Sequence, residues 1–238
     1  MELLYSEQTK LGNYIDLIGE PAEENILIVG VIHGDEPQGK YLIEKYIEDR
    51  YNAPLSPTLA PCGRRVVPTI PRRGNEKGIL FIPCLNPDGM MNNTRTNSNN
   101  VDINRNFPTQ NWGKNEGDNA TCDDETTNYF GGKSAGSEIE TQFLIETIEN
   151  YSPNLVMTLH APYKVVNYDG PAQKEAEAIS KIINYPVEAS IGYPTPGSFG
   201  TWAGVERNIP TITLELDEEI PVQQLVKPAF EIFDYLKH

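Results

Sequence analysis

Histidine, cysteine and basic residues are scarce in this sequence of 238 residues, which has three histidines, three cysteines, and 19 Lys and Arg against 34 Asp and Glu. The cysteines, Cys62, Cys84 and Cys122, are odd in number and follow no metal-binding spacing, which favours a reducing compartment over a disulfide framework. No apolar run approaches the ~20 residues that a membrane-spanning helix needs. The first residues do not resemble a signal peptide either, because no basic segment precedes an apolar core. We therefore expect a cytoplasmic protein.

The formal net charge of -15 limits the classes of partner. An acidic surface repels nucleic-acid phosphates and anionic lipid headgroups, so we expect neither nucleic acid nor a membrane as a partner. A small anionic substrate is compatible with this charge, because a local group of arginines can reverse the electrostatic potential inside a cleft. Amphipathic surfaces could support a homodimer.

Apolar segments of strand length alternate with segments of helical periodicity, which is typical of an α/β layered fold with a mostly parallel sheet. The pattern predicts strands at 26–32, 79–85, 155–159 and 211–216, and helices at 38–49, 138–150, 172–184 and 222–236. Two stretches without a period, 52–78 and 112–136, are predicted to be long loops. With 38% hydrophobic residues, the chain can bury a core without disulfide bonds. Its length fits a single domain, residues 1–238.

Two of the three histidines follow predicted strands. His33 comes directly after the first strand, begins a helix-like segment and lies three residues before Glu36, and His160 follows the third strand. A catalytic zinc ion takes three protein ligands, imidazole and carboxylate groups among them, and leaves one position open for water. His33, Glu36 and His160 are therefore candidate ligands for one divalent cation, Zn²⁺, per chain.

Two other polar residues occupy similar places, because Asn86 follows the second predicted strand and Glu215 lies near the end of the fourth. Ligands of open α/β sheets bind at the carboxyl ends of the strands. Glu215 stands between Leu214 and Leu216, where burial would raise the pKa of its carboxyl group. Such a group can take a proton from water and pass it on. Together with the candidate cation, this placement predicts metal-assisted hydrolysis.

The segment 86–108 is polar, rich in Asn and able to form turns. By itself it would fit a surface loop with Asx turns. Its arginines, Arg95 and Arg105, are also candidate anion receptors, because a guanidinium group can bind a carboxylate through two parallel hydrogen bonds.

Taken together, these motifs resemble the zinc metallocarboxypeptidases of the funnelin type. The resemblance covers about 26–216 and rests on an HxxE motif, NPDG at 86–89, Arg95, DINRNF at 102–107, His160, and the pair Tyr193 and Glu215. The segments 100–112, 136–142 and 191–202 are similar to a small bacterial branch of that family, the murein peptide amidases. The resemblance implies an α/β/α sandwich with a mixed, mostly parallel central sheet.

The resemblance also implies roles in catalysis. His33, Glu36 and His160 would hold zinc, and Glu215 would act first as general base and then as general acid. Arg95 would stabilise the oxyanion of the tetrahedral intermediate, the electrostatic task that usually contributes most to such a reaction.

Further residues would position the zinc ligands and the substrate. Asp102 would fix the tautomer of a zinc-binding histidine, and Asn104 and Arg105 would bind the terminal carboxylate of the substrate. Tyr193 would close over the bound peptide from a mobile loop. Thr213 would line the pocket, together with Thr195 and the loop 163–170.

Murein peptide amidases cut the bond between γ-D-glutamate and meso-diaminopimelate, so the resemblance implies a small murein tripeptide as substrate and a role in peptidoglycan recycling or in growth on wall fragments. A general metallocarboxypeptidase of other specificity is the first alternative. Deacylases similar to succinylglutamate desuccinylase and aspartoacylase share the HxxE motif and a later His, but they lack the full 86–107 motifs and the Tyr193 loop. A non-catalytic murein-fragment binding protein would have lost Glu215 or a ligand, and this chain retains them.

Overall fold

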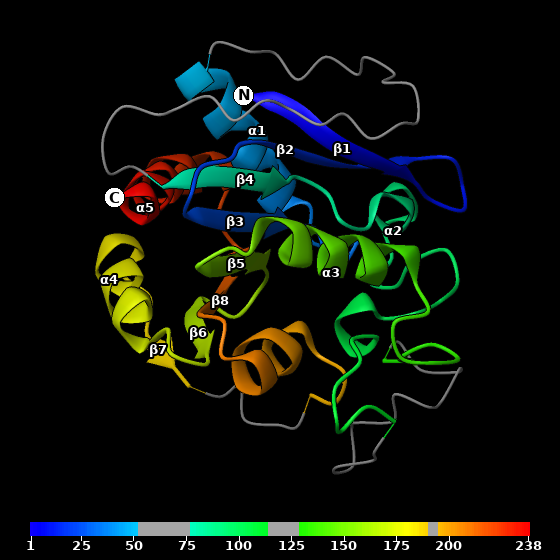
Figure 1. The fold of residues 1–238 in the computed structure, drawn as a ribbon. Coiled ribbons are helices and arrows are strands. Elements are labelled where there is room, and N and C mark those ends of the chain that lie inside the picture. Colours follow the sequence, from blue (N-terminus) through cyan, green and yellow to red (C-terminus); the bar gives the residue numbers. More distant parts are fainter. Residues whose placement is uncertain (52–76, 114–128, 190–194) are drawn as a thin grey trace.

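Eight strands form one mixed sheet in the computed structural model of the chain, which describes residues 1–51, 77–113, 129–189 and 195–238 (Figure 1). Their order across the sheet is β1-β2-β4-β3-β5-β8-β6-β7. The strands are β1 (Glu2–Gln8), β2 (Tyr14–Glu20), β3 (Asn25–Gly30), β4 (Gly78–Ile82), β5 (Leu155–His160), β6 (Val165–Asp169), β7 (Val187–Glu188) and β8 (Thr211–Glu215).

The four central strands, β4, β3, β5 and β8, run parallel. Every residue of β3, β4 and β5 is buried, as expected for strands that are covered on both faces. These four are the strands predicted from apolar runs, so the expected α/β sandwich with a mixed, mostly parallel sheet is confirmed. The strands β1, β2, β6 and β7, which lie toward the sheet edges, were not predicted. The pairs β1–β2, β2–β4 and β6–β8 are antiparallel, whereas β6 and β7 run parallel.

The four predicted helices are also present, as α1 (Gln38–Tyr51), α3 (Ile139–Tyr151), α4 (Gln173–Ile183) and α5 (Val226–Lys237). The last begins later than predicted, because residues Val222–Leu225 form a separate 3₁₀ turn, η3. Three short elements were not predicted: α2 (Pro87–Asn92), the 3₁₀ turn η1 (Ile103–Arg105) and the π-helical turn η2 (Thr201–Val205). The predicted loops fall largely outside the described residues, which omit 52–76 and 114–128.

One prediction about the first histidine is wrong, because the segment from His33 to Glu36 is a turn and α1 begins only at Gln38. The backbone N–H of Glu36 donates to the carbonyl of His33 at 3.2 Å. Pro37 follows, and the residue before a proline disfavours helical geometry because its backbone meets the pyrrolidine ring. The turn therefore brings the side chains of His33 and Glu36 together before the helix starts.

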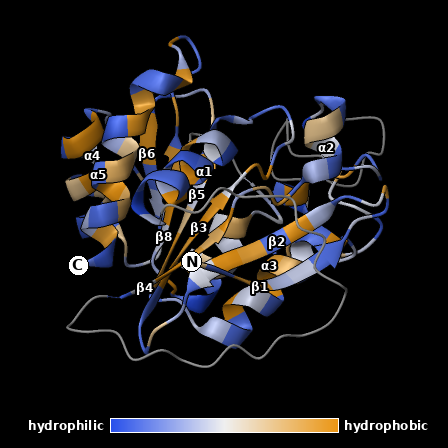
Figure 2. Ribbon diagram, turned by 90° about the horizontal axis from the view of Figure 1, so that it is seen from above, coloured by the Kyte–Doolittle hydropathy of each residue, from blue (hydrophilic) through white to orange (hydrophobic). Residues whose placement is uncertain are grey.

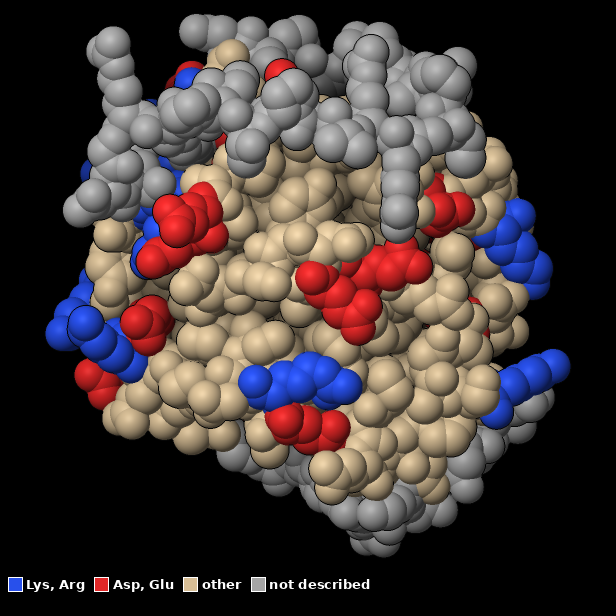
Figure 3. Space-filling model, in the orientation of Figure 1, with Lys and Arg blue, Asp and Glu red and all other residues tan. Residues whose placement is uncertain are grey.

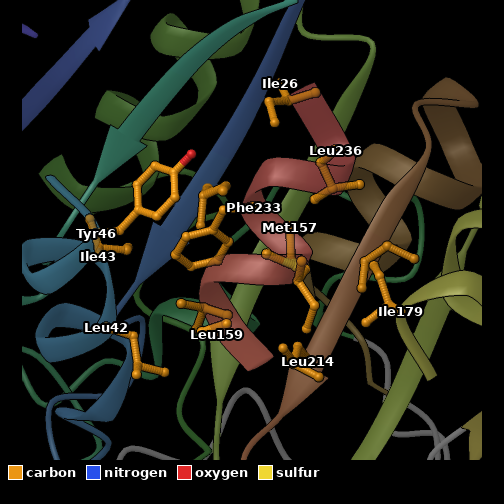
Figure 4. Packing of buried hydrophobic residues seen from close by; sticks show 14 of the residues in the cluster. Ile26, Leu42, Ile43, Tyr46, Met157, Leu159, Ile179, Leu214, Phe233 and Leu236 are labelled. Carbon is orange, nitrogen blue, oxygen red and sulfur yellow. The ribbon is translucent and has the colours of Figure 1, made fainter. Parts of the chain in front are cut away.

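The sheet separates two hydrophobic cores, because successive side chains of a strand point to opposite faces. On one face, strand residues such as Met157 and Leu214 pack against α1, α4 and α5, as Figure 4 shows around Phe233. On the other face, Val156 and its neighbours pack against α3 and η2. In the hydropathy view of Figure 2, the central strands are strongly hydrophobic and the helices around them carry both hydrophobic and hydrophilic residues. Alternation along β5 and β8 places the side chains of His160 and Glu215 on the second face.

The surface carries charges of both signs. On the face drawn in Figure 3, acidic and basic side chains lie in small separate groups. Within the described residues, no helix has the length and apolar character needed to cross a membrane. Cys84 is a buried free thiol, whereas Cys62 and Cys122 lie outside the described ranges.

Candidate metal centre and substrate cleft

Three candidate ligands converge at the carboxyl ends of two neighbouring strands. His33 follows β3, His160 is the last residue of β5, and these strands pair in parallel. Nδ1 of His33 lies 2.8 Å from Oε1 of Glu36, and Nδ1 of His160 lies 2.9 Å from Oε2 of the same carboxylate. The two Nδ1 atoms are 3.2 Å apart, and the potential ligand atoms all lie within 4.8 Å of one another. Residues 127 positions apart in the chain thus share one small site.

The chain reaches this site through a strained residue. Val31, directly after β3, has a φ of 54° although it is β-branched and fully buried. Such a left-handed conformation costs roughly 1–3 kcal/mol and persists only where the surroundings hold it. Asn86 supplies that hold, because its backbone N–H donates to the carbonyl of Val31 at 2.9 Å and its amide donates to that of Ile32 at 3.3 Å. Asn86 therefore directs the backbone that presents His33, a role that the sequence analysis did not assign.

The electrostatics of the three residues favour a cation between them. Burial acts to lower the pKa of His33, but the Glu36 and Asp102 carboxylates offset this effect and raise that pKa to about 9. Burial acts to raise the pKa of Glu36, yet His33 and His160 hold it well below its ordinary value. A carboxylate that raises the proton affinity of an imidazole favours a positive charge between the two groups. A divalent ion would supply that charge.

Asp102 orients the first histidine. Its carboxylate is fully buried and accepts hydrogen bonds from Nε2 of His33 at 3.2 Å, Nε of Arg95 at 3.0 Å and the backbone N–H of Asn104 at 2.9 Å. Burial acts to raise the pKa of Asp102, but Arg95 and His33 keep it far below its ordinary value. Because an ionised carboxylate only accepts, Nε2 of His33 carries a proton, and Nδ1, which faces Glu36, is the nitrogen that a metal ion would bind.

Glu215 lies beside the three candidate ligands and pairs with His160 in the register of β5 and β8. Its Oε2 atom is buried and has no hydrogen-bond partner in the described part of the chain. Burial raises the pKa of this carboxyl group above its ordinary value. Two residues earlier, the hydroxyl of Thr213 accepts a hydrogen bond from Thr158 at 3.4 Å. A buried carboxylate oxygen without a partner is well placed to exchange a proton with a bound molecule.

The two candidate anion receptors share an aromatic neighbour. The ring of Tyr129 lies 5.3 Å from the Arg95 guanidinium and 5.8 Å from that of Arg105, in cation–π geometry. A guanidinium N–H of Arg105 also donates to the backbone carbonyl of Asn104 at 2.7 Å. The side-chain oxygen of Asn104 accepts from the backbone N–H of Phe199 at 2.9 Å. The sequence analysis missed Tyr129, because it lies outside the motifs and only the fold brings it to these arginines.

A buried polar network supports the loop that carries Asp102. The amide of Asn97 donates to Glu138 at 2.8 Å and to Glu140 at 3.1 Å, and its oxygen accepts from the backbone N–H of Val101 at 3.1 Å. Glu140 is 1% exposed, and its burial raises the pKa of its carboxyl group to about 7. Two carboxylates and one amide therefore set the conformation of the loop from α3.

We expect the variant Glu140→Gln to be more stable than the unmodified protein at pH 8, by up to about 3 kcal/mol, because one pKa unit corresponds to about 1.4 kcal/mol. The folded-state pKa is raised from 4.5 to about 7. The folded state therefore holds the proton more tightly than the unfolded state does, and stability falls as the pH rises through that window. Urea unfolding at pH 5 and pH 8 measures this, with Glu146→Gln on the exposed side of α3 as control. An equal effect of Glu140→Gln at both pH values would contradict the assignment.

The structure describes every site residue predicted from the sequence except Tyr193, which lies outside the described residues. The donor set fits zinc: two imidazole nitrogens and a carboxylate oxygen face one point, and three protein ligands leave a fourth tetrahedral position. The hydrogen bond from His33 to Asp102 is the second contact that zinc-binding histidines usually make.

Comparison with known proteins places these features in context. A family model described as zinc carboxypeptidase matches residues 6–233. Murein peptide amidase A of Escherichia coli K12 is 31% identical over 198 residues, which are 82% of this chain and 72% of that protein. Its counterpart in Vibrio campbellii is 39% identical over 140 residues, 57% of this chain and 55% of that protein.

Solved structures agree with the sequence comparison. The crystal structure of a murein-tripeptide amidase from Escherichia coli O157 superposes with a TM-score of 0.74 at 26% identity and covers 100% of this chain and 94% of that one. Carboxypeptidase A from Helicoverpa armigera gives a TM-score of 0.70 at 15% identity, over 98% of this chain and 67% of that one, which shows a common fold.

Proposed function

Because the chain belongs to the zinc carboxypeptidase family, and is therefore a zinc-dependent hydrolase of peptide or amide bonds, we propose that it cleaves the bond between γ-D-glutamate and meso-diaminopimelate in murein tripeptides. We propose that residues 1–238 form one catalytic domain with one Zn²⁺ ion, and that it acts in the cytoplasm. The observation that carries the proposal is the convergence of His33, Glu36 and His160 beside the unpartnered carboxylate of Glu215.

Both histidines, His33 and His160, would hold the ion through Nδ1, and Glu36 would hold it through a carboxylate oxygen. Bound zinc lowers the pKa of water toward ~7 and polarises a carbonyl group. Asp102 keeps the His33 proton on Nε2, away from the ion. The orientation of the ligands is thus set by hydrogen bonds within the chain.

Glu215 and Arg95 would perform the remaining chemistry. The Glu215 carboxylate takes a proton from the attacking water and then delivers it to the leaving amine, and its buried Oε2 is free for this transfer. Arg95 uses its Nε to bind Asp102, which leaves the terminal N–H groups of its guanidinium to donate to the developing oxyanion. Tyr193 would close over the peptide, as the family resemblance implies.

The murein specificity draws support from the relatives and from the polar character of the cleft. Two relatives that cover most of this chain, at 31% and 26% identity, are named as murein peptide amidases. Thr158, Thr213 and Asn167 line the sheet near Glu215, where a hydrophobic-specific carboxypeptidase would need apolar side chains. These residues suit a substrate that carries several charged groups.

The decisive experiment incubates the zinc-loaded protein with L-Ala-γ-D-Glu-meso-diaminopimelate and measures free diaminopimelate by mass spectrometry. N-succinylglutamate and a dipeptide with a C-terminal phenylalanine serve as comparison substrates. We expect the tripeptide to be cleaved at least 100-fold faster than either. Faster cleavage of the dipeptide would instead support a general carboxypeptidase, and faster cleavage of N-succinylglutamate a deacylase.

We expect Arg105→Ala to raise KM for the tripeptide by about 10- to 100-fold, because a hydrogen bond to a charged group contributes about 1.5–3 kcal/mol. Arg105 is 4% exposed and would bind the α-carboxylate of the C-terminal residue together with Asn104. Steady-state kinetics with the free acid and with its α-carboxamide measures this effect. The variant should lose the preference for the free acid, whereas Arg50→Ala, an exposed site on α1, should keep it. A preserved preference in Arg105→Ala would show that another group binds the carboxylate.

A further inference from the structure

Arg105 is a nearly buried cation with little around it to balance its charge. Its side chain donates to the backbone carbonyl of Asn104 at 2.7 Å, and the residue is 4% exposed. Within the described residues it forms no ion pair, and the negative charge of Asp102 acts on it without a hydrogen bond. A buried charge is costly unless neighbouring groups offset it.

The ring of Tyr129 supplies part of that balance. Its centroid lies 5.8 Å from the guanidinium carbon of Arg105 and 5.3 Å from that of Arg95. The face of an aromatic ring is negative, so it attracts a cation within about 6 Å of its centroid. Arg95 also pairs with Asp102 through Nε at 3.0 Å. Two guanidinium groups of like charge therefore share one ring.

The segment that carries Tyr129 is fixed to the loop that carries Arg105. The backbone carbonyl of Phe130 accepts from the backbone N–H of Asp102 at 2.8 Å, and the carbonyl of Gly131 accepts from the side-chain amide of Asn106 at 2.7 Å. Phe130 is buried, whereas Tyr129 is 39% exposed. The ring is thus held against both guanidinium groups without filling a core, so its removal should leave the fold intact.

We propose that Tyr129 is a positioning residue, which holds the guanidinium groups of Arg95 and Arg105 in the arrangement that the reaction needs. This assignment rests on the proposed function, in which Arg105 binds the terminal carboxylate and Arg95 stabilises the oxyanion. The carboxylate and the scissile carbonyl belong to neighbouring residues of one peptide, so the spacing of the two arginines matters. Their like charges repel each other. A ring that attracts both keeps these long side chains in place.

The first test removes the ring. Tyr129→Leu should lower kcat by about 5- to 30-fold, the strength of a partly desolvated cation–π contact, for the tripeptide and for its α-carboxamide, because both need Arg95. KM should rise by a similar factor for the free acid only, because only that peptide places a carboxylate at Arg105. Tyr129→Phe keeps the ring and should stay within about twofold of the unmodified protein. Tyr235→Leu, a similarly exposed site on α5, is the matched control.

A second series changes the electron density of the ring and hardly changes its shape. Phenylalanine and its mono-, di- and trifluoro analogues, placed at position 129, withdraw increasing electron density from the face of the ring. If attraction to the ring positions the arginines, kcat should fall steadily with each added fluorine. A packing role would leave kcat level along the series, and that result would overturn the assignment.

A third measurement does not depend on turnover. A double-mutant cycle compares Tyr129→Leu, Arg105→Met and the double variant by urea unfolding of the zinc-loaded protein. The double variant should raise the equilibrium constant for unfolding by about 5- to 30-fold less than the product of the two single effects. Such coupling without cleavage of the tripeptide would support the hold of Tyr129 on Arg105 and show that only the proposed reaction is wrong. Additive effects, or cleavage whose kcat and KM do not respond to Tyr129→Leu, would overturn the assignment.

Discussion

Replacing Glu215 by Gln is expected to lower kcat by about 10³- to 10⁴-fold while the protein keeps its fold and its metal, because a positioned acid–base group contributes up to about 10⁴-fold. Glutamine has the same shape and cannot accept the proton of the attacking water. Glu215 is not one of the three candidate ligands, which are His33, Glu36 and His160, so zinc should remain bound at one ion per chain. The buried Oε2 atom lacks a partner in the described residues. In the variant, the nitrogen or the oxygen of the glutamine amide takes the place of this atom at little structural cost.

The measurement combines steady-state kinetics on the murein tripeptide with elemental analysis of the purified variant. Glu218→Gln, three residues further on and exposed, is the matched control and should retain full activity. In contrast, His160→Ala should lose both activity and zinc. A Glu215→Gln protein that holds zinc and keeps more than a tenth of kcat would show that another group acts as the base.

Replacing Arg95 by Ala should reduce kcat by about 10²- to 10³-fold, the usual effect of removing one oxyanion donor. KM should change much less, because the oxyanion forms only during the reaction. Arg95 lies close to the candidate metal ligands, with a guanidinium nitrogen 3.9 Å from Oε1 of Glu36, and its Nε donates to Asp102. The side chain is 24% exposed, so part of the guanidinium reaches the cleft.

Loss of Arg95 also removes a partner of the buried Asp102, so reduced activity alone would not separate catalysis from stability. Added guanidinium ions should restore part of kcat in Arg95→Ala, and they should not restore kcat in Glu215→Gln. Arg95→Lys keeps the charge but lacks the planar guanidinium group, and its kcat should fall between those of the unmodified protein and Arg95→Ala. An Arg95→Ala protein that is folded, contains zinc and shows a raised KM with unchanged kcat would assign Arg95 to substrate binding instead.

The central strands were predictable because burial on both faces leaves a continuous apolar run, as in Ile26 to Ile32. The edge strands were not, because a strand such as β2 mixes Asp16 and Gly19 with apolar residues and owes its place to pairing with β1 and β4. The turn at His33 was mistaken for the start of a helix. Its shape depends on Pro37, and the strained Val31 before it is held by Asn86 from another part of the chain.

The site residues could be chosen from the sequence because few residue types perform this chemistry and they stand at the ends of apolar runs. His33, Glu36, His160 and Glu215 were selected on that ground, and the structure groups them. Tyr129 gave no such signal. An aromatic residue over two guanidinium groups becomes visible only when distant segments meet.

The amino-acid sequence by itself determined the α/β layering and the residue types of the centre, since hydrophobic periodicity and ligand chemistry are local properties of a chain. Tertiary structure alone decided which groups have partners: the carboxylate of Asp102 has three donors, whereas the Oε2 atom of Glu215 has none in the described residues. The physical reason is that burial and pairing of a charge depend on neighbours that strand register and helix packing bring together from remote positions.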